Sequence, residues 1–225
     1  MPRQSTSLNR ATPELIAEHA LLIVDQDGHT ALSFRTLATA LDIPVASLQR
    51  RVTDLAGLLD LVTDHLAARL PQIPPGTGWA TATETRFTAL YELLTDHPGL
   101  VALRGDRPWL GPQLLKRLVE PQLADSLAAG MTPEEAIITY RRLYLLTLGS
   151  ASFVNHRDPK AAQAATRRAL AELDPDEFPV LTGQLGAILP AVVDHEVYFG
   201  ALHQLIAAAD PARTTLVPGQ AAEGK

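Results

Sequence analysis

The stretch SFRTLATALDIPVASLQRRVTDLAGLL, residues 33–59, decides the fold of this 225-residue chain. A helical apolar pattern runs up to residue 41, residues 42–44 (Asp-Ile-Pro) interrupt it, and it then resumes. Two short helices joined by a turn of about three to four residues make a helix-turn-helix. The apolar positions are Phe34, Leu37, Ala38 and Leu41 before the break, and Leu48 and Val52 after it.

A helix-turn-helix presents its second helix to the DNA major groove. Ser33 is placed to cap the first helix, where free N–H groups can hold a phosphate, and Arg35 can assist with its charge. Glutamine can bind adenine, arginine can bind guanine or phosphate, and small apolar side chains can touch a thymine methyl. The alternative is an ordinary pair of amphipathic helices with solvated arginines. The residues of the second helix not needed for packing, and hence the candidate DNA contacts, are Val45, Ala46, Ser47, Gln49, Arg50 and Arg51.

The order of elements from Thr12 to about Leu66 resembles the tetracycline-repressor (TetR) family of transcriptional regulators. This resemblance implies an all-α fold, with an N-terminal three-helix DNA-binding domain and a larger C-terminal helical bundle. It rests on a capped first helix, Gly28, the Ser33-Phe34-Arg35 opening, Leu37-Ala38, Leu41-Asp42-Ile43, Leu48, Val52 and Leu58-Leu59.

The sequence departs from the family pattern at three positions of this region. Asp42, Gln49 and Leu55 stand where the family commonly has glycine, tyrosine and a phosphate-binding lysine. These departures keep a second hypothesis open, that of a helical ligand-binding or interaction protein whose DNA-reading head has decayed.

Composition agrees with a helical protein. Apolar residues make up 46% of the chain, aromatic residues only 5%, and cysteine is absent, which excludes disulfides and thiolate metal sites. The net charge of −6 argues against non-specific nucleic-acid binding by the whole molecule. No apolar run approaches the roughly 20 residues that a membrane span needs, and the opening MPRQSTSLNR lacks the apolar segment of a signal peptide. We therefore expect a cytoplasmic protein without a membrane partner.

The chain is predicted to divide into four parts. Residues 1–70 form the helix-turn-helix domain, residues 71–78 (PQIPPGTG) a linker, residues 79–210 an effector-binding and dimerisation domain, and residues 211–225 a disordered tail. The first helix is predicted to begin at Thr12-Pro13-Glu14 and to end at Gly28. Asp54 is predicted to cap a helix that runs to Leu70, and Pro121 to kink or weaken a later one.

The C-terminal half also resembles TetR-family effector domains, through GMTPEEA (130–136), DPDEFPVL (174–181) and VYFGALHQLI (197–206). The resemblance implies a homodimer formed through the last long helices, and a cavity for a small effector. The broad apolar faces of residues 132–153 and 194–209 support the dimer independently, with Leu202 and Leu205 expected at the interface. We expect the cavity to be mainly apolar and bordered by residues 79–153.

A search for catalytic or metal sites finds little. The seven histidines are scattered, and Asp194-His195-Glu196 are consecutive on a helix, so their side chains diverge by about 100° each. We predict no enzyme activity, no cofactor and no metal. Candidate pocket residues, for which core packing or a solvated face is the alternative, are Arg104, Trp109, Tyr140 and Tyr144. The sequence thus predicts a transcriptional repressor that binds a double-stranded palindromic operator as a dimer and is released by a small apolar or amphipathic effector.

Overall fold

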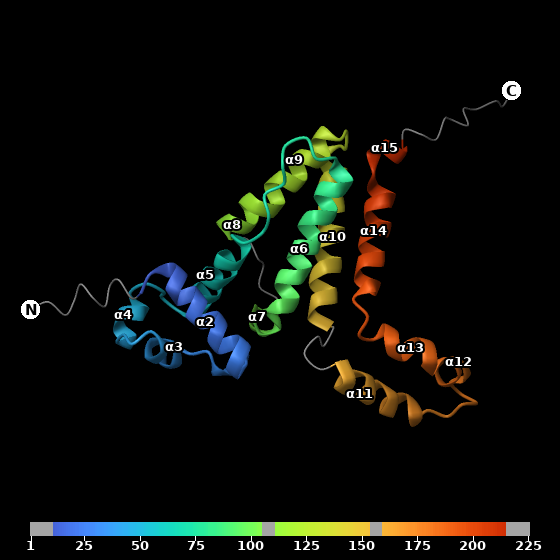
Figure 1. Cartoon of the computed structure of the whole chain (residues 1–225), viewed down its shortest axis with the longest axis horizontal. Helices are drawn as coiled ribbons and strands as arrows, with labels where there is room; N and C mark the ends of the chain where they lie inside the picture. The colour runs from blue at the N-terminus through green and yellow to red at the C-terminus, as the bar shows by residue number, and fades with distance from the viewer. Residues whose placement is uncertain (1–10, 105–110, 154–158, 215–225) are drawn as a thin grey trace, which may run out of the picture.

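The computed structural model describes residues 11–104, 111–153 and 159–214, and these ranges contain helices and no strand (Figure 1). The predicted all-α fold is confirmed. A group of helices at the N-terminal end adjoins a C-terminal helical bundle. The N-terminal group comprises α2 (Pro13–Asp27), η1 (His29–Ala31), α3 (Phe34–Ala40), α4 (Val45–Gln49) and α5 (Leu55–Ala67). The bundle comprises α6 (Trp79–Asp96), α7 (Pro98–Arg104), α8 (Pro112–Leu114), η2 (Leu115–Val119), α9 (Glu120–Ala128), α10 (Pro133–Phe153) and α14 (Glu196–Ala209).

Three short helices, α11 (Pro159–Ala171), α12 (Pro179–Gly183) and α13 (Leu185–Ala191), form an arm between α10 and α14 (Figure 1). Residues 211–214 form a further helix, α15 (Pro211–Thr214), so the predicted disorder of the tail is wrong for these four positions. The rest of that tail lies outside the described residues. Among the described residues no single helix is both long and apolar enough to cross a membrane, although α13 and α14 reach that length and apolarity as a pair bent by 79°.

The first helix begins and ends where the sequence predicted. The Thr12 hydroxyl accepts a hydrogen bond from the Leu15 N–H at 3.3 Å, and Pro13 occupies the first helical position, where its missing N–H costs nothing. Gly28, with φ of 87°, ends the helix in a conformation that a residue with a Cβ rarely adopts. Local signals therefore fix both ends of this helix.

Helix α5 belongs to two hydrophobic cores. Its first turns contribute Leu58 and Val62 to a core built from residues 11–66, and its last turn contributes Ala67 to a core of the C-terminal bundle. Asp54 caps it by accepting a hydrogen bond from the Gly57 N–H at 2.8 Å, as predicted, but the helix ends at Ala67, and a turn carries the chain to Leu70. The domain division at residues 71–78 stays a prediction, and Leu100 of α7 packs in the first core.

Contacts at two further places join the N-terminal group to the bundle. At the start of α7, the His97 Nδ1 lies 2.8 Å from the Asp25 Oδ2 of α2, and Gly99 lies so close to Val24 that no Cβ would fit. At the start of α8, the Asp64 Oδ1 of α5 accepts a hydrogen bond from the Gln113 N–H at 2.6 Å. Both ends of the segment 97–113 are therefore fastened to the N-terminal helices.

The helix that contains Pro121 carries a local defect just before the proline. Residues Leu115–Val119 form a π-helical turn, η2, which is wider than the α-helix on either side. Proline has no N–H to donate to the carbonyl four residues earlier, and its ring crowds that carbonyl, so the preceding turn must widen or bend. The predicted weakening at Pro121 is confirmed in this form.

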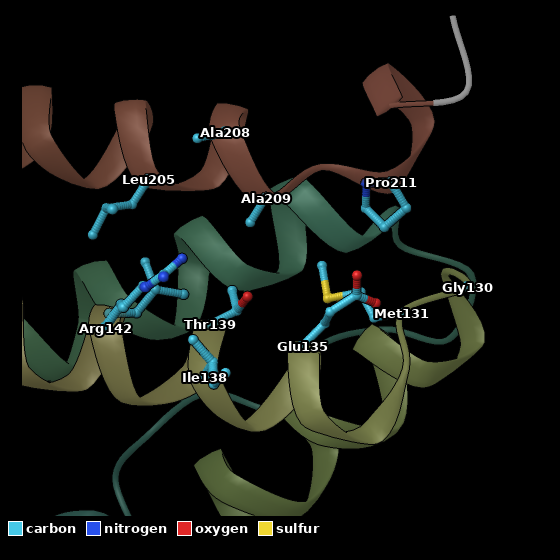
Figure 2. A pocket seen from close by; sticks show the side chains of 11 residues that line it. Gly130, Met131, Glu135, Ile138, Thr139, Arg142, Leu205, Ala208, Ala209 and Pro211 are labelled. Carbon is cyan, nitrogen blue, oxygen red and sulfur yellow. The ribbon is translucent and has the colours of Figure 1, made fainter. Parts of the chain in front are cut away.

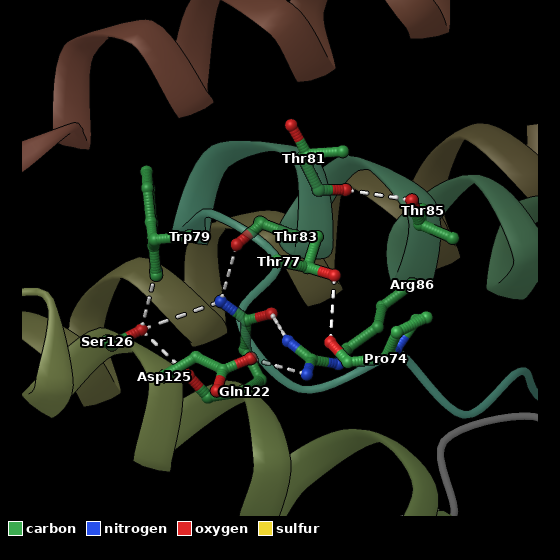
Figure 3. Close-up of polar contacts among 10 residues, drawn as sticks. All are labelled: Pro74, Thr77, Trp79, Thr81, Thr83, Thr85, Arg86, Gln122, Asp125 and Ser126. Carbon is green, nitrogen blue, oxygen red and sulfur yellow. Dashed lines mark hydrogen bonds and ion pairs between the residues drawn. The ribbon is translucent and has the colours of Figure 1, made fainter.

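A buried polar cluster joins α6 to α9 (Figure 3). The Arg86 guanidinium donates to the Gln122 Oε1 at 3.1 Å and to the Asp125 Oδ2 at 2.5 Å, and the Trp79 Nε1 donates to the Ser126 Oγ at 2.9 Å. Arg86 is only 4% exposed and Gln122 is fully buried. Because polar groups in such a place are costly without partners, these bonds allow only one alignment of the two helices.

Replacing Arg86 with leucine should lower the free energy of unfolding by about 3 kcal/mol, because Gln122 and the Asp125 carboxylate would lose their buried partner. Urea unfolding followed by circular dichroism measures this change. Arg168→Leu, at an exposed position of α11, is the matched control and should change stability by less than about 0.5 kcal/mol. Equal stability of the two variants would show that the cluster contributes nothing net.

Candidate nucleic-acid interface and ligand cavity

The first helix of the predicted helix-turn-helix, α3, starts with a reciprocal cap. The Ser33 Oγ accepts from the Thr36 N–H at 3.1 Å, and the Thr36 Oγ1 accepts from the Ser33 N–H at 3.0 Å. The Ser33 side chain therefore serves the helix itself, and the exposed Arg35 is the charged side chain at this end.

The turn between the two helices depends on Asp42, whose φ is 52°. Aspartate tolerates this left-handed conformation better than most residues with a side chain, so Asp42 can do the work of the glycine common in the family at this position. The Ile43 N–H then donates to the Ala38 carbonyl at 3.0 Å and closes the turn. The predicted helix-turn-helix geometry is present.

The second helix, α4, is shorter than predicted and ends at Gln49, and Arg50 and Arg51 form the turn that follows. Ala46, Gln49 and both arginines are exposed, as base or phosphate contacts must be. A hydrogen bond of 3.0 Å from the Arg50 guanidinium to the Ser47 Oγ holds that arginine along the helix.

Two of the candidate DNA contacts, Ser47 and Val45, are only partly exposed, and Val45 is the one that packs in a core. The sequence predicts that Val45 is free of packing, but its side chain is half-buried and packs against the N-terminal core. The reason is its place at the first turn of α4, directly after the chain passes Ile43 of that core. Val45 therefore anchors α4 to the core more than it contributes to the candidate DNA-contact surface.

The predicted pocket residues Tyr140 and Tyr144 lie in an aromatic cluster instead. Their ring centroids are 5.6 Å apart, and Tyr140 also faces Phe87 of α6 at 6.3 Å. A second aromatic cluster lies in the same hydrophobic core, where Tyr91 stacks on Tyr198 at 3.8 Å. Burial raises the pKa of the Tyr140 and Tyr198 hydroxyls well above their ordinary value, so both stay neutral. Tyr140 and Tyr144 therefore pack in the core, which is the alternative to a role in a pocket.

A cavity of about 460 Å³ lies on another side of α10, between it and α14 (Figure 2). The predicted border of residues 79–153 holds for the wall formed by α10 and the turn before it, whereas α14 and Pro211 supply the other wall. Tyr140 and Tyr144 do not line it, and Trp109 and the side chain of Arg104 lie outside the described residues. The lining residues are Gly130, Met131, Glu135, Ile138, Thr139, Arg142, Leu143, Leu205, Ala208, Ala209 and Pro211.

Sequence reasoning missed the polar lining residues Glu135, Thr139 and Arg142. They recur at intervals of four and three, which places them on one face of a mostly apolar helix. That spacing was the available signal. It could not reveal the cavity, because the facing wall comes from a helix more than 50 residues further along the chain.

No group of three or more metal-ligating side chains converges anywhere in the described ranges. His195, the middle residue of the Asp194-His195-Glu196 run, instead places its Nδ1 3.2 Å from the Tyr91 hydroxyl. The ring therefore serves the second aromatic cluster.

Comparison with known proteins finds relatives in sequence and similar solved structures, although no family model matches the chain. An HTH-type transcriptional regulator of Saccharopolyspora erythraea is 31% identical over 193 residues, which are 82% of this chain and 79% of the relative. The HTH-type transcriptional repressor DrrR1 of Streptomyces coeruleorubidus is 30% identical over 140 residues, 60% of this chain and 49% of the repressor. Both names describe regulators of transcription, and neither describes an enzyme.

Among solved structures, the TetR family protein ActR of Streptomyces coelicolor in complex with actinorhodin is 28% identical with a TM-score of 0.73. The match covers 90% of this chain and 97% of ActR. The helix-turn-helix, the helical C-terminal bundle and the 31% identity across most of the Saccharopolyspora regulator lead to one conclusion: the chain belongs to the TetR family of helix-turn-helix transcriptional regulators.

Proposed function

We propose that the protein is a ligand-responsive transcriptional repressor that binds a palindromic operator as a dimer and leaves it when a small amphipathic effector occupies the C-terminal domain. The observation that carries the proposal is the exposed set Ala46, Gln49, Arg50 and Arg51 on a capped helix-turn-helix. A repressor among the relatives and the ActR complexes with actinorhodin and (S)-DNPA support the two halves of the proposal.

In the proposed complex α4 enters the major groove. Gln49 binds adenine through its amide, and Arg50 or Arg51 binds guanine or a phosphate. Arg35, at the start of α3, contacts the backbone of the DNA, which adds affinity without sequence preference. Two such surfaces on a two-fold dimer read two half-sites, which is why the operator is palindromic.

The dimer is proposed to form through exposed apolar side chains of α10 and α14. Ile137, Leu145 and Val197 are 52%, 56% and 57% exposed on these two helices, and a second copy of the chain would remove them from water. The expected role of Leu202 is wrong, because this side chain is fully buried in its own subunit and cannot reach a partner. Leu205 lines the cavity.

We call the helix-turn-helix of each subunit, residues 33–51, its reading head. Release from the operator requires that the effector bind more tightly to one arrangement of the two reading heads in the dimer than to another. The contacts His97–Asp25 and Asp64–Gln113 connect the bundle to α2 and α5, which carry the helix-turn-helix. A shift of α7 or of α8 would therefore reach the helix-turn-helix.

One observation favours the second candidate, a regulator-like protein without a working reading head. Leu55, at the start of α5, is 43% exposed where the family commonly has a phosphate-binding lysine, so one backbone contact is lost. The first experiment below separates the two candidates.

Selection from random double-stranded DNA should recover a two-fold symmetric site. Gln49→Ala should relax the preference at one position per half-site at a cost of about 1–3 kcal/mol, because it removes a base contact. Arg35→Ala, the matched phosphate variant, should weaken binding to all sequences alike and flatten the salt dependence by about one unit of slope. A folded dimer that enriches no site at low salt would favour the second candidate.

A double variant, Leu145→Glu and Val197→Glu, should be a monomer in multi-angle light scattering, because each change buries a charge in the proposed interface. Leu22→Glu is the control, since Leu22 is similarly exposed at 51% but lies on α2. It should leave the dimer intact. A wild-type protein that is a monomer at micromolar concentration would contradict the proposed assembly.

Gly99→Ala should weaken operator binding about tenfold with helical content unchanged, because the added Cβ collides with Val24 and displaces the reading head at an overpacking cost of about 1–3 kcal/mol. Fluorescence anisotropy with the selected operator measures the affinity. Gly186→Ala, where a Cβ meets open space, is the control and should bind as the wild type does. Equal binding of both variants would show that α7 does not position the reading head.

A further inference from the structure

We propose that the cavity between α10 and α14 binds an organic acid with an apolar body, and that Arg142 binds its acid group. The claim that such an acid is the effector rests on the proposed function, whereas the claim that it binds in the cavity does not.

The size and walls of the cavity suit a small molecule with an apolar body. Its volume of about 460 Å³ falls within the range of about 300–1,000 Å³ typical of ligand sites. Met131, Ile138, Leu143 and Leu205 line it with apolar side chains from both helices and from the turn before α10 (Figure 2). An apolar ligand surface placed there leaves water, which favours binding.

Arg142 supplies the positive charge. Its guanidinium projects into the cavity (Figure 2), and it has no hydrogen bond or ion pair with any residue in the described ranges. A guanidinium fork matches a carboxylate in shape and can donate two parallel hydrogen bonds to it. The neighbouring Arg141 is equally exposed but does not line the cavity.

Glu135 is the one acidic side chain among the lining residues, and it already has partners. Its Oε2 accepts hydrogen bonds from the Thr132 N–H at 2.8 Å and the Thr132 hydroxyl at 2.9 Å, which closes the cap of α10. These bonds hold the pKa of Glu135 below its ordinary value, so the group is anionic at neutral pH. Thr139 lies between the two charges (Figure 2). The acid group of a ligand is therefore attracted to Arg142 and repelled by Glu135. A ligand amine would find no free carboxylate among the lining residues, because Glu135 is already bonded to Thr132.

The cavity also reaches the face proposed for dimerisation. Ile138 and Ala208 line it and are themselves exposed on α10 and α14. A ligand seated on Arg142 would lie beside the second copy of the chain, where it could alter the angle between subunits. This is the route by which a bound acid could change the spacing of the reading heads.

Isothermal titration of the full-length protein without DNA tests the site. The probes are decanoate and 2-naphthoate, each compared with its neutral primary amide. At least one acid should bind about tenfold more tightly than its amide, because a charge-assisted pair with Arg142 is worth more than a neutral hydrogen bond. Arg142→Gln should abolish that difference, and the matched control Arg141→Gln should keep it.

Three results would overturn the inference: no binding of either acid, equal affinity for acid and amide, or the same loss in both arginine variants. In a second titration, the acid that bound in the first is added to the complex of the protein with its operator. Release with the wild type but not with Arg142→Gln makes the acid an effector. Binding without release confines the inference to a ligand site, and failure to bind any operator counts against the proposed function alone.

Discussion

Much of this molecule depends on the fact that a single helix, α5, has to satisfy two hydrophobic cores. Its 13 residues bury Leu58 and Val62 in the N-terminal core and Ala67 in the C-terminal one. A helix committed on both sides cannot rotate to suit one core without opening the other. The reading head and the bundle therefore share one rigid element, and the Asp64 carboxylate on it also holds the start of α8.

Polar groups inside the bundle restrict it further. Apolar side chains of similar volume can slide past one another at small cost, whereas Arg86, Gln122 and Ser126 lose hydrogen bonds if α6 and α9 shift. On the other side of α6, the stacked rings of Tyr91 and Tyr198 fix α14 in the same way. The relative positions of the helices in the bundle are thus fixed more closely than apolar packing alone would fix them. The ligand cavity lies beside this core, between α10 and α14.

The sequence predicted well what neighbouring residues decide. The caps at Thr12, Ser33 and Asp54 and the break at residues 42–44 depend on groups a few positions apart, and all were confirmed. Errors arose where packing between distant segments decides. Leu202 follows the same helical pattern as an interface residue would, and only the position of α6 and α10 shows that it faces inward. The α14 wall of the cavity and the place of Arg142 in its lining were missed for the same reason.

The π-helical turn before Pro121 has a consequence for the helix as a whole. Leu114, Leu118, Gln122 and Ser126 are spaced by four residues and are all buried. In a regular α-helix such a row drifts around the axis by about 40° per step, which would turn its far end away from the bundle. The wider turn between residues 115 and 119 takes up part of that drift. Pro121 interrupts backbone hydrogen bonding, and the wider turn that results keeps the four buried residues in one line against α6 and its neighbours. The first two of the four, Leu114 and Leu118, are apolar, and the last two, Gln122 and Ser126, are polar.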